Sequence, residues 1–285
     1  MTKNPWKLVR IDPQQIKDNP YLNPRAPPPP PPPPDPAGSR PLAGSSIDGD
    51  YSLMPQTGTY GLGVDALREA CKNDPASAHP QFTLPDGSNV YRPLTFRENL
   101  EARVKDYETL RHSDGRAKTA EERQALFLEW LDSCTGMAYQ AKTTKFKVIP
   151  TCSPLITIDK ANKDAFLAVP YAAHTSGVEL DFSARGVKYN TLLTQSKVQA
   201  HPAWRAAVED DVPLLHTYSA IVFSLLKQKF NRDTGMEFYV CQNPDTDELR
   251  ALIVISLVNY SNAIGYDVLN VRGSSLRVAH RRRAT

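Results

Sequence analysis

Prolines are concentrated at one end of this chain, and they limit what its N-terminal third can form. Nineteen of the 25 prolines precede Leu94, and eight are consecutive, from Pro27 to Pro34. Each proline fixes φ and lacks a backbone N–H, so neither a helix nor a sheet ladder can propagate through such a segment. We therefore expect residues 1–93 to form an extended proline-rich arm, followed by a globular domain over residues 94–279 and a basic tail over residues 280–285.

The octaproline is the most specific motif in the arm. It favours a polyproline II rod about 25 Å long, at roughly 3.1 Å per residue. Such a rod can bind an aromatic-lined groove or serve as a stiff spacer. We favour the spacer, which would hold an apolar N-terminal tip, residues 1–22, away from the domain. The candidate protein-binding residues belong to this tip and the rod: Trp6, Leu8, Val9, Ile11, Tyr21, Leu22, Pro27, Pro28, Pro29, Pro30, Pro31, Pro32, Pro33 and Pro34.

Two threonine–glutamate capping boxes open the domain, at Thr95 and at Thr119. Apolar residues at helical spacing follow each box, so we expect helices over residues 96–110 and 120–134. A polar turn around Asp114–Gly115 would join them as a helical hairpin.

The sequence of the rest of the domain predicts short strands and one long amphipathic helix. His201–Pro202 interrupts a shorter helical stretch, and Asp211 caps the long helix. Residues 249–260 fit either a helix or a buried strand, and we favour the helix. The order of elements shows no regular βαβ alternation, so the predicted class is α+β, a single mixed domain. The predicted strands cover residues 145–149, 155–158, 166–169, 178–182 and 236–241, with a closing β-hairpin over 266–271 and 275–279.

Charge gives the whole chain little attraction for nucleic acid or anionic lipid. The sequence holds 34 Lys and Arg against 31 Asp and Glu, a formal net charge of +3. Five arginines nevertheless follow Asp267 with no acidic residue among them. Such a cluster can bind phosphates, and a solvated terminus is the alternative interpretation. The candidate nucleic-acid contacts are Arg277, Arg281, Arg282 and Arg283.

Cysteine spacing and apolar segments argue against several classes of protein. The four cysteines are far apart and form no CxxC pair, which disfavours a zinc knuckle and a dense disulfide framework. No apolar stretch follows the first basic residues, so no secretory signal is expected. The longest apolar run, residues 251–258, is far shorter than the roughly 20 residues of a membrane-spanning helix. We expect a chain without a membrane span or cofactor, in the cytoplasm or within a virion.

Candidate chemistry rests on few residues. Cys152, Ser153 and His174 are the set closest to a hydrolase-type nucleophile and base, but no nucleophile elbow or cysteine-protease pattern surrounds them. A buried thiol and a surface imidazole are the simpler interpretation. His201 and His216 could approach one metal ion, yet no third ligand is evident, so we expect no metal site.

The leading hypothesis is a non-enzymatic structural subunit of a larger multi-protein assembly, for which a viral or phage particle is one setting. Its N-terminal arm would contact neighbouring subunits, because an exposed tip rich in aromatic and aliphatic residues favours burial against another chain. Three alternatives remain: a polyproline-presenting adaptor, a nucleic-acid-contacting protein acting through the basic tail, and a Cys/His hydrolase.

Overall fold

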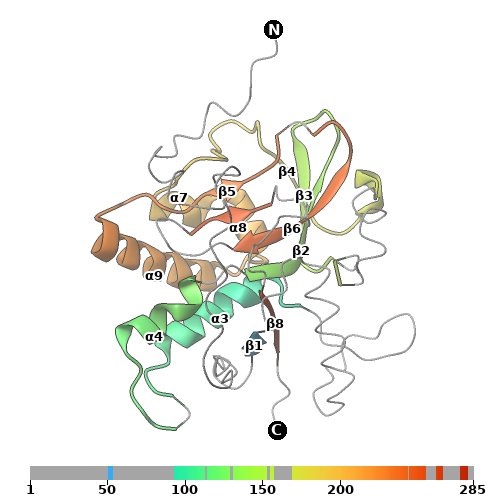
Figure 1. The fold of residues 1–285 in the computed structure, drawn as a ribbon. Coiled ribbons are helices and arrows are strands. Elements are labelled where there is room, and N and C mark those ends of the chain that lie inside the picture. The colour runs from blue at the N-terminus through green and yellow to red at the C-terminus, as the bar shows by residue number, and fades with distance from the viewer. Residues whose placement is uncertain are drawn as a thin grey trace, which may run out of the picture. The chain divides into compact units, whose positions relative to one another are not determined.

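A mixed sheet forms the centre of the described part of the chain, and helices flank it (Figure 1). The computed structural model describes residues 51–53, 93–112, 114–128, 131–152, 155–156, 169–242, 244–254, 261–265 and 277–281. All of them belong to one compact unit, residues 44–285. The described part is α+β, as the sequence predicted.

The sheet has eight described strands in the order β1-β8-β2-β6-β7-β5, with β3 added beside β2 and β4 beside β3. Strand β2 pairs antiparallel with β6 and β3, and parallel with β8. The strands are β1 (Tyr51–Leu53), β2 (Leu131–Tyr139), β3 (Lys145–Ile149), β4 (Val178–Asp181), β5 (Phe238–Tyr239), β6 (Glu248–Val254), β7 (Ala263–Ile264) and β8 (Arg277–Arg281).

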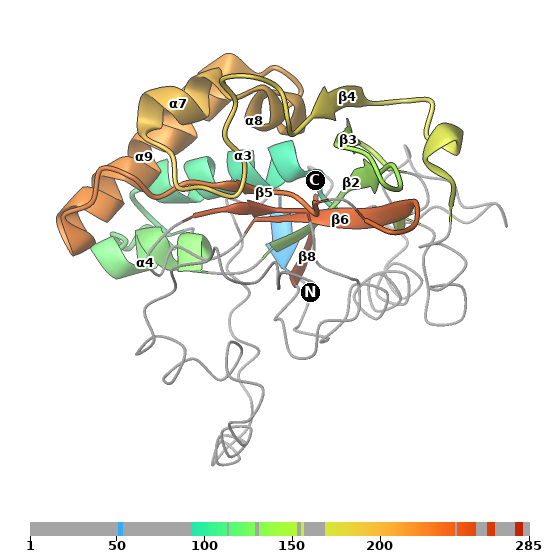
Figure 2. The same ribbon diagram turned by 90° about the horizontal axis from the view of Figure 1, so that it is seen from above.

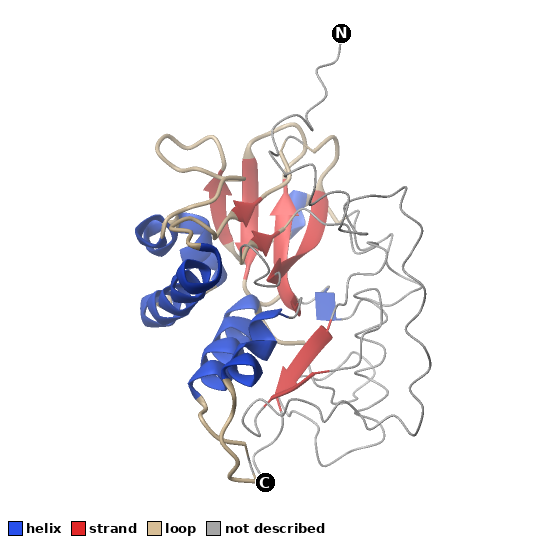
Figure 3. Cartoon of the chain, turned by 60° about the vertical axis from the view of Figure 1, so that its left-hand side comes forward, coloured by secondary structure: helices blue, strands red, loops and turns tan. Residues whose placement is uncertain are grey.

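The main helices lie together on one side of the central strands (Figures 2 and 3). The longest, α9, packs against α3, α7 and α8. The helices are α3 (Phe96–Glu108), α4 (Ala120–Gln124), α7 (Gln195–Ala200), α8 (Pro202–Ala207) and α9 (Val212–Phe230), with short 3₁₀ turns η3 (Ala125–Leu128) and η4 (Tyr171–Ala173).

The sheet is covered by apolar groups on both faces. Alternate residues of β6 divide between two clusters: Leu252 and Val254 join the larger one with the helices, whereas Ala251 and Ile253 join a smaller one with Cys152. All nine residues of β2 are buried. A strand buried on both faces loses the alternation of polar and apolar residues that normally identifies a strand.

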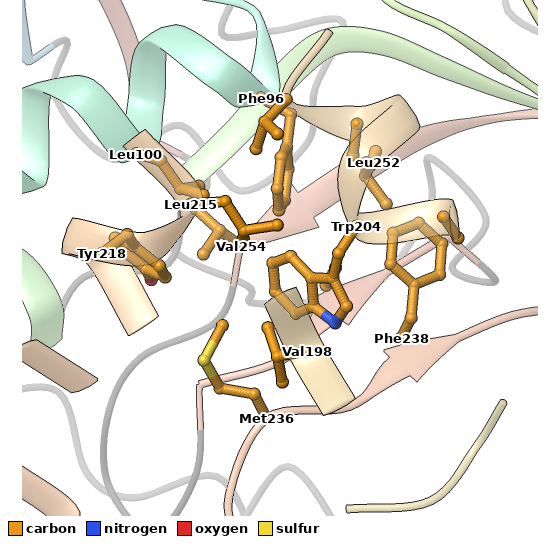
Figure 4. Packing of buried hydrophobic residues seen from close by; sticks show 14 of the residues in the cluster. Phe96, Leu100, Val198, Trp204, Leu215, Tyr218, Met236, Phe238, Leu252 and Val254 are labelled. Atoms are coloured by element: carbon orange, nitrogen blue, oxygen red, sulfur yellow. The ribbon is translucent and has the colours of Figure 1, made fainter. Parts of the chain in front are cut away.

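Trp204 lies at the centre of the larger cluster (Figure 4). Its side chain is fully buried, and its ring centroid lies 5.8 Å from that of Phe96 on α3 and 5.7 Å from that of Phe238 on β5. These contacts join α8 to α3 and to β5. Aromatic pairs at such distances add to the burial of apolar surface.

The structure confirms several local predictions. Both capping boxes are formed, and each threonine hydroxyl accepts from the backbone N–H three residues later, Thr95 from Glu98 and Thr119 from Glu122. Asp211 caps α9 as expected. Strands β3 and β4 occupy residues 145–149 and 178–181, as the β-rich runs predicted.

The prediction of a helix over residues 120–134, the second of the expected hairpin, is wrong beyond its first turns. The apolar spacing predicted a helix to Cys134 ended by Gly136, but α4 ends at Gln124 and residues 131–139 form β2. Cys134 and Gly136 therefore lie inside a strand. Because both faces of β2 are covered, its continuous apolar run resembles a buried helix in sequence.

The preference for a helix over residues 249–260 is also wrong, for the same reason. Residues 248–254 form β6, which pairs with β2 along its length. Its β-branched Ile253 and Val254 fit a strand packed on both faces. Residues 255–260 lie outside the described residues.

Four other predicted strands have mixed outcomes. Leu155 and Ile156 are helical rather than extended, so the strand predicted over residues 155–158 is wrong there. The strand predicted over residues 236–241 is shorter than expected, because β5 covers two residues. Residues 166–168, and the first strand of the closing hairpin over 266–271, lie outside the described residues.

Residues on both sides of the predicted domain, 94–279, form strands that the sequence did not predict. Tyr51–Leu53, inside the expected arm, pairs antiparallel with β8. The expectation that no sheet ladder forms before residue 94 is therefore wrong at these three residues. At the other end, His280 and Arg281 extend β8 into the range expected to be a tail.

Within the described ranges, no helix combines the length and apolar character that crossing a bilayer requires.

Candidate functional site

Strand β4 forms an edge of the sheet. It pairs with β3 on one side, and no strand in the described part of the chain pairs with its other side. The strand is accessible, because Val178 is 46% exposed and the Glu179 side chain 47%. An open edge presents unpaired backbone donors and acceptors that can bind another extended segment.

The pairing register of β3 and β4 shows which backbone N–H and C=O groups of β4 lie on its open side. The N–H of Phe182 donates to the carbonyl of Thr144 at 3.0 Å, which makes these two residues a hydrogen-bonded pair. Hydrogen-bonded and non-hydrogen-bonded pairs alternate along an antiparallel ladder. The backbone N–H and C=O groups of Glu179 and Asp181 therefore point away from β3. The Asp181 carbonyl already accepts from the Ala184 N–H at 3.1 Å, so both groups of Glu179 and the N–H of Asp181 can bind another strand.

The two faces of β4 differ in chemistry. Leu180 packs against the larger apolar cluster, and Val178 shares its face. Glu179 and Asp181 lie on the opposite face, and hydrogen bonds lower the pKa of both carboxyl groups. At neutral pH β4 is therefore apolar on one face and carries two carboxylates on the other, where Lys145 and Lys147 of β3 lie across from them.

A polar network positions the Glu179 carboxylate. The Glu179 carboxylate accepts hydrogen bonds from the Tyr171 hydroxyl at 2.9 Å and from the Lys145 ammonium at 3.2 Å, and these two bonds are the main causes of its lowered pKa. The Lys147 ammonium lies 4.3 Å from the centre of the Tyr171 ring, a cation–π contact. The network holds Glu179 in one orientation but leaves it half exposed.

The segment that precedes β4 is fixed to the sheet at several points. Asp247 accepts from the backbone N–H of Tyr171 at 2.7 Å and from that of Ala141 at 2.8 Å. At Gly177, φ is +125°, and an added Cβ would lie 2.7 Å from the Val148 carbonyl oxygen. Only glycine meets both conditions, so this residue allows β4 to approach β3.

His174 lies in this segment, but it does not form the site that the sequence suggested. It is 7% exposed, not a surface imidazole, and its Nε2 has no hydrogen-bond partner among the residues that the structure describes. Burial, with a smaller effect of Lys147, lowers its pKa, so the ring is neutral at pH 7. Its backbone carbonyl accepts from the Lys147 ammonium at 2.8 Å.

Cys152 is buried in the smaller apolar cluster. Burial raises the pKa of its thiol to about 11, and the hydrogen bond it accepts comes from the backbone of Leu155. No imidazole is among the groups that affect its pKa. A thiol that stays protonated at neutral pH is a poor nucleophile, so this environment does not favour Cys152 as a catalytic residue. Ser153 lies outside the described residues.

His201 and His216 are not arranged as two ligands of one metal ion. His201 is buried at the start of α8, where its Nδ1 accepts from the Ala203 N–H and its Nε2 lies 3.1 Å from the Lys188 carbonyl oxygen. His216 lies on the exposed side of α9. Over the ranges that the structure describes, no three His, Cys, Asp or Glu side chains gather as metal ligands would.

The remaining candidates are only partly described. Arg277 and Arg281 are backbone positions at the two ends of β8. The tip residues, the octaproline, Arg282 and Arg283 lie outside the described residues, so their roles stay predictions.

Sequence reasoning found strand β4 but missed its importance. Which strand forms an edge depends on strand order, and no local pattern encodes that order. Lys147, Tyr171 and Asp247 were missed because they are far apart in sequence. The alternation of Val178, Glu179, Leu180 and Asp181 was the available signal, since a half-exposed strand alternates in this way.

Comparison with known proteins adds little to this description. No protein-family profile matches the chain, and no curated protein matches it. One similar solved structure is described as "Accommodation of massive sequence variation in Nanoarchaeota by the C-type lectin fold". It is 13% identical, the match covers 83% of this chain and 100% of that chain, and the TM-score is 0.49. Function is therefore argued from this chain's own residues.

Proposed function

We propose that this chain is a non-enzymatic subunit of a larger multi-protein assembly, and that its N-terminal arm contacts neighbouring subunits. The observation that carries the proposal is the open edge of β4, where the N–H and C=O of Glu179 and the N–H of Asp181 point outward. A sheet edge of this kind binds extended segments by adding a strand. A viral or phage particle is one setting for such a subunit.

The sequence of the arm complements this property of the domain. Its prolines favour extended conformations, and its tip carries aromatic and aliphatic side chains. A binding edge in the domain and an extended apolar segment in the arm are the two parts that strand exchange between subunits requires. The buried, protonated Cys152 and the buried, neutral His174 lend no support to the hydrolase alternative.

Deleting residues 1–36 tests the proposal. We expect the deleted chain to keep its near-ultraviolet circular dichroism, because none of the described strands and helices lies in those residues. It should lose association, measured as a fall in sedimentation coefficient to that of a monomer. Association that is unchanged by the deletion would overturn the proposal.

A second variant separates the spacer from the adaptor. Replacing Pro27–Pro34 by a Gly/Ser linker of matched reach removes the polyproline ligand but keeps the tip attached. If the rod is a spacer, this variant still associates, with affinity reduced by less than about tenfold, since only stiffness is lost. Loss of association equal to that of the deletion would favour polyproline recognition.

A further inference from the structure

Two buried side chains hold the segment that leads into β4. Tyr171 and His174 are buried, whereas Ala172, Ala173 and residues 175–177 are all exposed. The ring of Tyr171 packs in the smaller apolar cluster. His174 is therefore the last buried side chain before β4 begins.

The surroundings of His174 suit a neutral ring and oppose a charged one. Lys147 on β3 donates from its ammonium to the His174 carbonyl oxygen at 2.8 Å and lies 4.3 Å from the centre of the Tyr171 ring. Protonation of His174 would add a positive charge and a second N–H donor to its ring. The buried Nε2 has no acceptor among the described residues, and a buried charge without a partner is costly.

The carboxylates of this region are already engaged. Asp247 attracts a charged His174, but more weakly than Lys147 repels it. Both oxygens of Asp247 accept backbone N–H groups, at 2.7 and 2.8 Å. The oxygens of Glu179 accept from the Tyr171 hydroxyl and the Lys145 ammonium. Each carboxylate is fixed by two bonds, so turning toward the ring would break at least one of them.

We propose that protonation of His174 releases residues 174–178 from β3, so that the start of β4 opens reversibly in mild acid. The exposed residues on both sides of His174 give its ring a short path to water. Release breaks the bond from Lys147 to the His174 carbonyl and the pairing of Val178 with Val148. The packing of Leu180 in the larger apolar cluster retains the other end of β4.

The direction of the pH dependence follows from the two states of the segment. Burial and Lys147 lower the pKa of His174 in the closed segment, whereas in the open segment the ring regains its ordinary value of 6.5. The closed segment is therefore fully stable above pH 6.5 and loses stability as the pH falls below it. Opening rises by up to about tenfold per pH unit in that range. The lowered pKa values of Glu179 and Asp181 keep both carboxylates charged there.

Amide hydrogen exchange at Val178 in the full-length chain tests the proposal. Hydrogen-bonded pairs alternate along the ladder from Thr144 and Phe182, so the Val178 N–H faces Val148 and reports on the first pair of β4. After correction for the intrinsic effect of pH, we expect exchange at Val178 to rise by about threefold or more between pH 7.5 and pH 5. A smaller rise would overturn the proposal.

Two variants remove the titration of His174. His174→Gln keeps a polar side chain and His174→Phe keeps an aromatic ring, so either one serves if the other fails to fold. In both, the corrected exchange at Val178 should no longer depend on pH in this range. A response equal to that of the wild-type chain would show that another group is responsible.

The matched control is His201→Asn, which removes the other buried histidine with a lowered pKa. It should keep the wild-type response at Val178, because His201 lies at the start of α8 and not beside β4. Loss of the response in this variant would mean that acid loosens the whole domain, and the proposed local switch would be wrong.

The charge of Lys147 gives an independent readout. Lys147→Met keeps most of the side chain but removes the ammonium that repels a charged ring. The pKa of His174, followed through its imidazole resonances by NMR, should move up toward 6.5. An unchanged or lower pKa would contradict the part assigned to Lys147.

This switch goes beyond the proposed function, although it opens one end of the edge to which that function is assigned. The two ideas can fail separately. Exchange at Val178 is a property of one chain and needs no partner, whereas association of the full and deleted chains at a constant pH of 7.5 tests the assembly role alone.

Discussion

Burial determines the behaviour of the histidine that begins α8. His201 is 4% exposed and stacks on Phe238 with ring centroids 6.0 Å apart. Burial lowers its pKa to about 4. The His201 ring is therefore neutral in the folded state, and its protonation at low pH favours unfolding. The side chain that the sequence presented as a weak metal candidate is part of the core.

The stability of the fold should therefore depend on pH through His201. The folded pKa lies below the ordinary value of about 6.5, so stability is complete above pH 6.5 and falls as the pH drops toward 4. Between pH 8 and pH 5 we expect the titration of His201 to remove about 2 kcal/mol from the free energy of unfolding, measured with urea as the difference between the wild-type chain and His201→Asn. The difference is needed because burial raises the pKa of Glu237 to about 7, and its protonation over the same range stabilises the folded state.

The control for this pH dependence is His201→Asn, which keeps a helix-capping side chain that does not titrate. It should be less stable at pH 8 but lose less stability on acidification. Some dependence should remain, because the pKa of His174 is lowered too. An equal loss in both proteins would contradict the assignment to His201.

Gly136 shows how closely the strands pack. A Cβ at this position would lie 2.9 Å from both Cβ and Sγ of Cys152 and 3.2 Å from a methyl group of Leu249. We expect Gly136→Ala to lower the free energy of unfolding by about 1–3 kcal/mol, since a packed interior resists added volume. In a Cys152→Ala background the effect should be smaller, because one of the two closest atoms is removed. Equal effects in the two backgrounds, measured by urea denaturation, would refute this explanation.

Among the elements, the ends of helices were easier to predict from sequence than the strands between them. Thr95, Thr119 and Asp211 cap helices by hydrogen bonds to residues within three positions, so their signal is local. Strands β2 and β6 were mistaken for helix because both their faces are buried. What covers each face comes from residues far away in the sequence, and no local pattern supplies that information.

The same contrast applies to the candidate site. Strand β4 was predicted from its β-rich composition, but its position at the sheet edge follows from the pairing of β3 with β2. The residues that hold Glu179 in place come from two other segments, around Lys145 and Tyr171. Because these contacts are three-dimensional, sequence reasoning did not find this site and weighed Cys152 and His174 only as an alternative.

The cap of α9 gives a test at the scale of one element. Asp211 accepts from the Leu214 N–H at 3.1 Å and from the Arg97 guanidinium at 2.7 Å, which ties α9 to α3. Asp211→Ala should lower the free energy of unfolding by about 1–2 kcal/mol, and Asp211→Asn by less, because asparagine also caps helices. Thermal and urea denaturation measure both.

The matched control is the neighbouring Asp210→Asn, because Asp210 has a φ of +60°, a left-handed conformation that asparagine adopts more readily than alanine. The Asp210 side chain is 67% exposed, and its ion pair with Arg205 is at the surface. Its loss should change stability by less than about 0.5 kcal/mol. If the variants at 210 and 211 were equally destabilised, the cap would not be the reason.

At the scale of the whole molecule, the domain and the arm have complementary properties. The domain presents an open sheet edge at β4, and the composition of the arm favours an extended segment with an apolar tip. In the assembly that we propose, these two parts would link one copy to the next. Its modest net charge of +3 also leaves assembly to local contacts instead of a global field.

The native mass of the full-length chain, measured by light scattering with and without residues 1–36, tests this account most directly. We predict a mass that is a multiple of 31.7 kDa for the full chain and a single-chain mass for the deleted protein. A full-length chain that stays at 31.7 kDa over a concentration range of about 1–100 μM, where typical subunit contacts form, would contradict it.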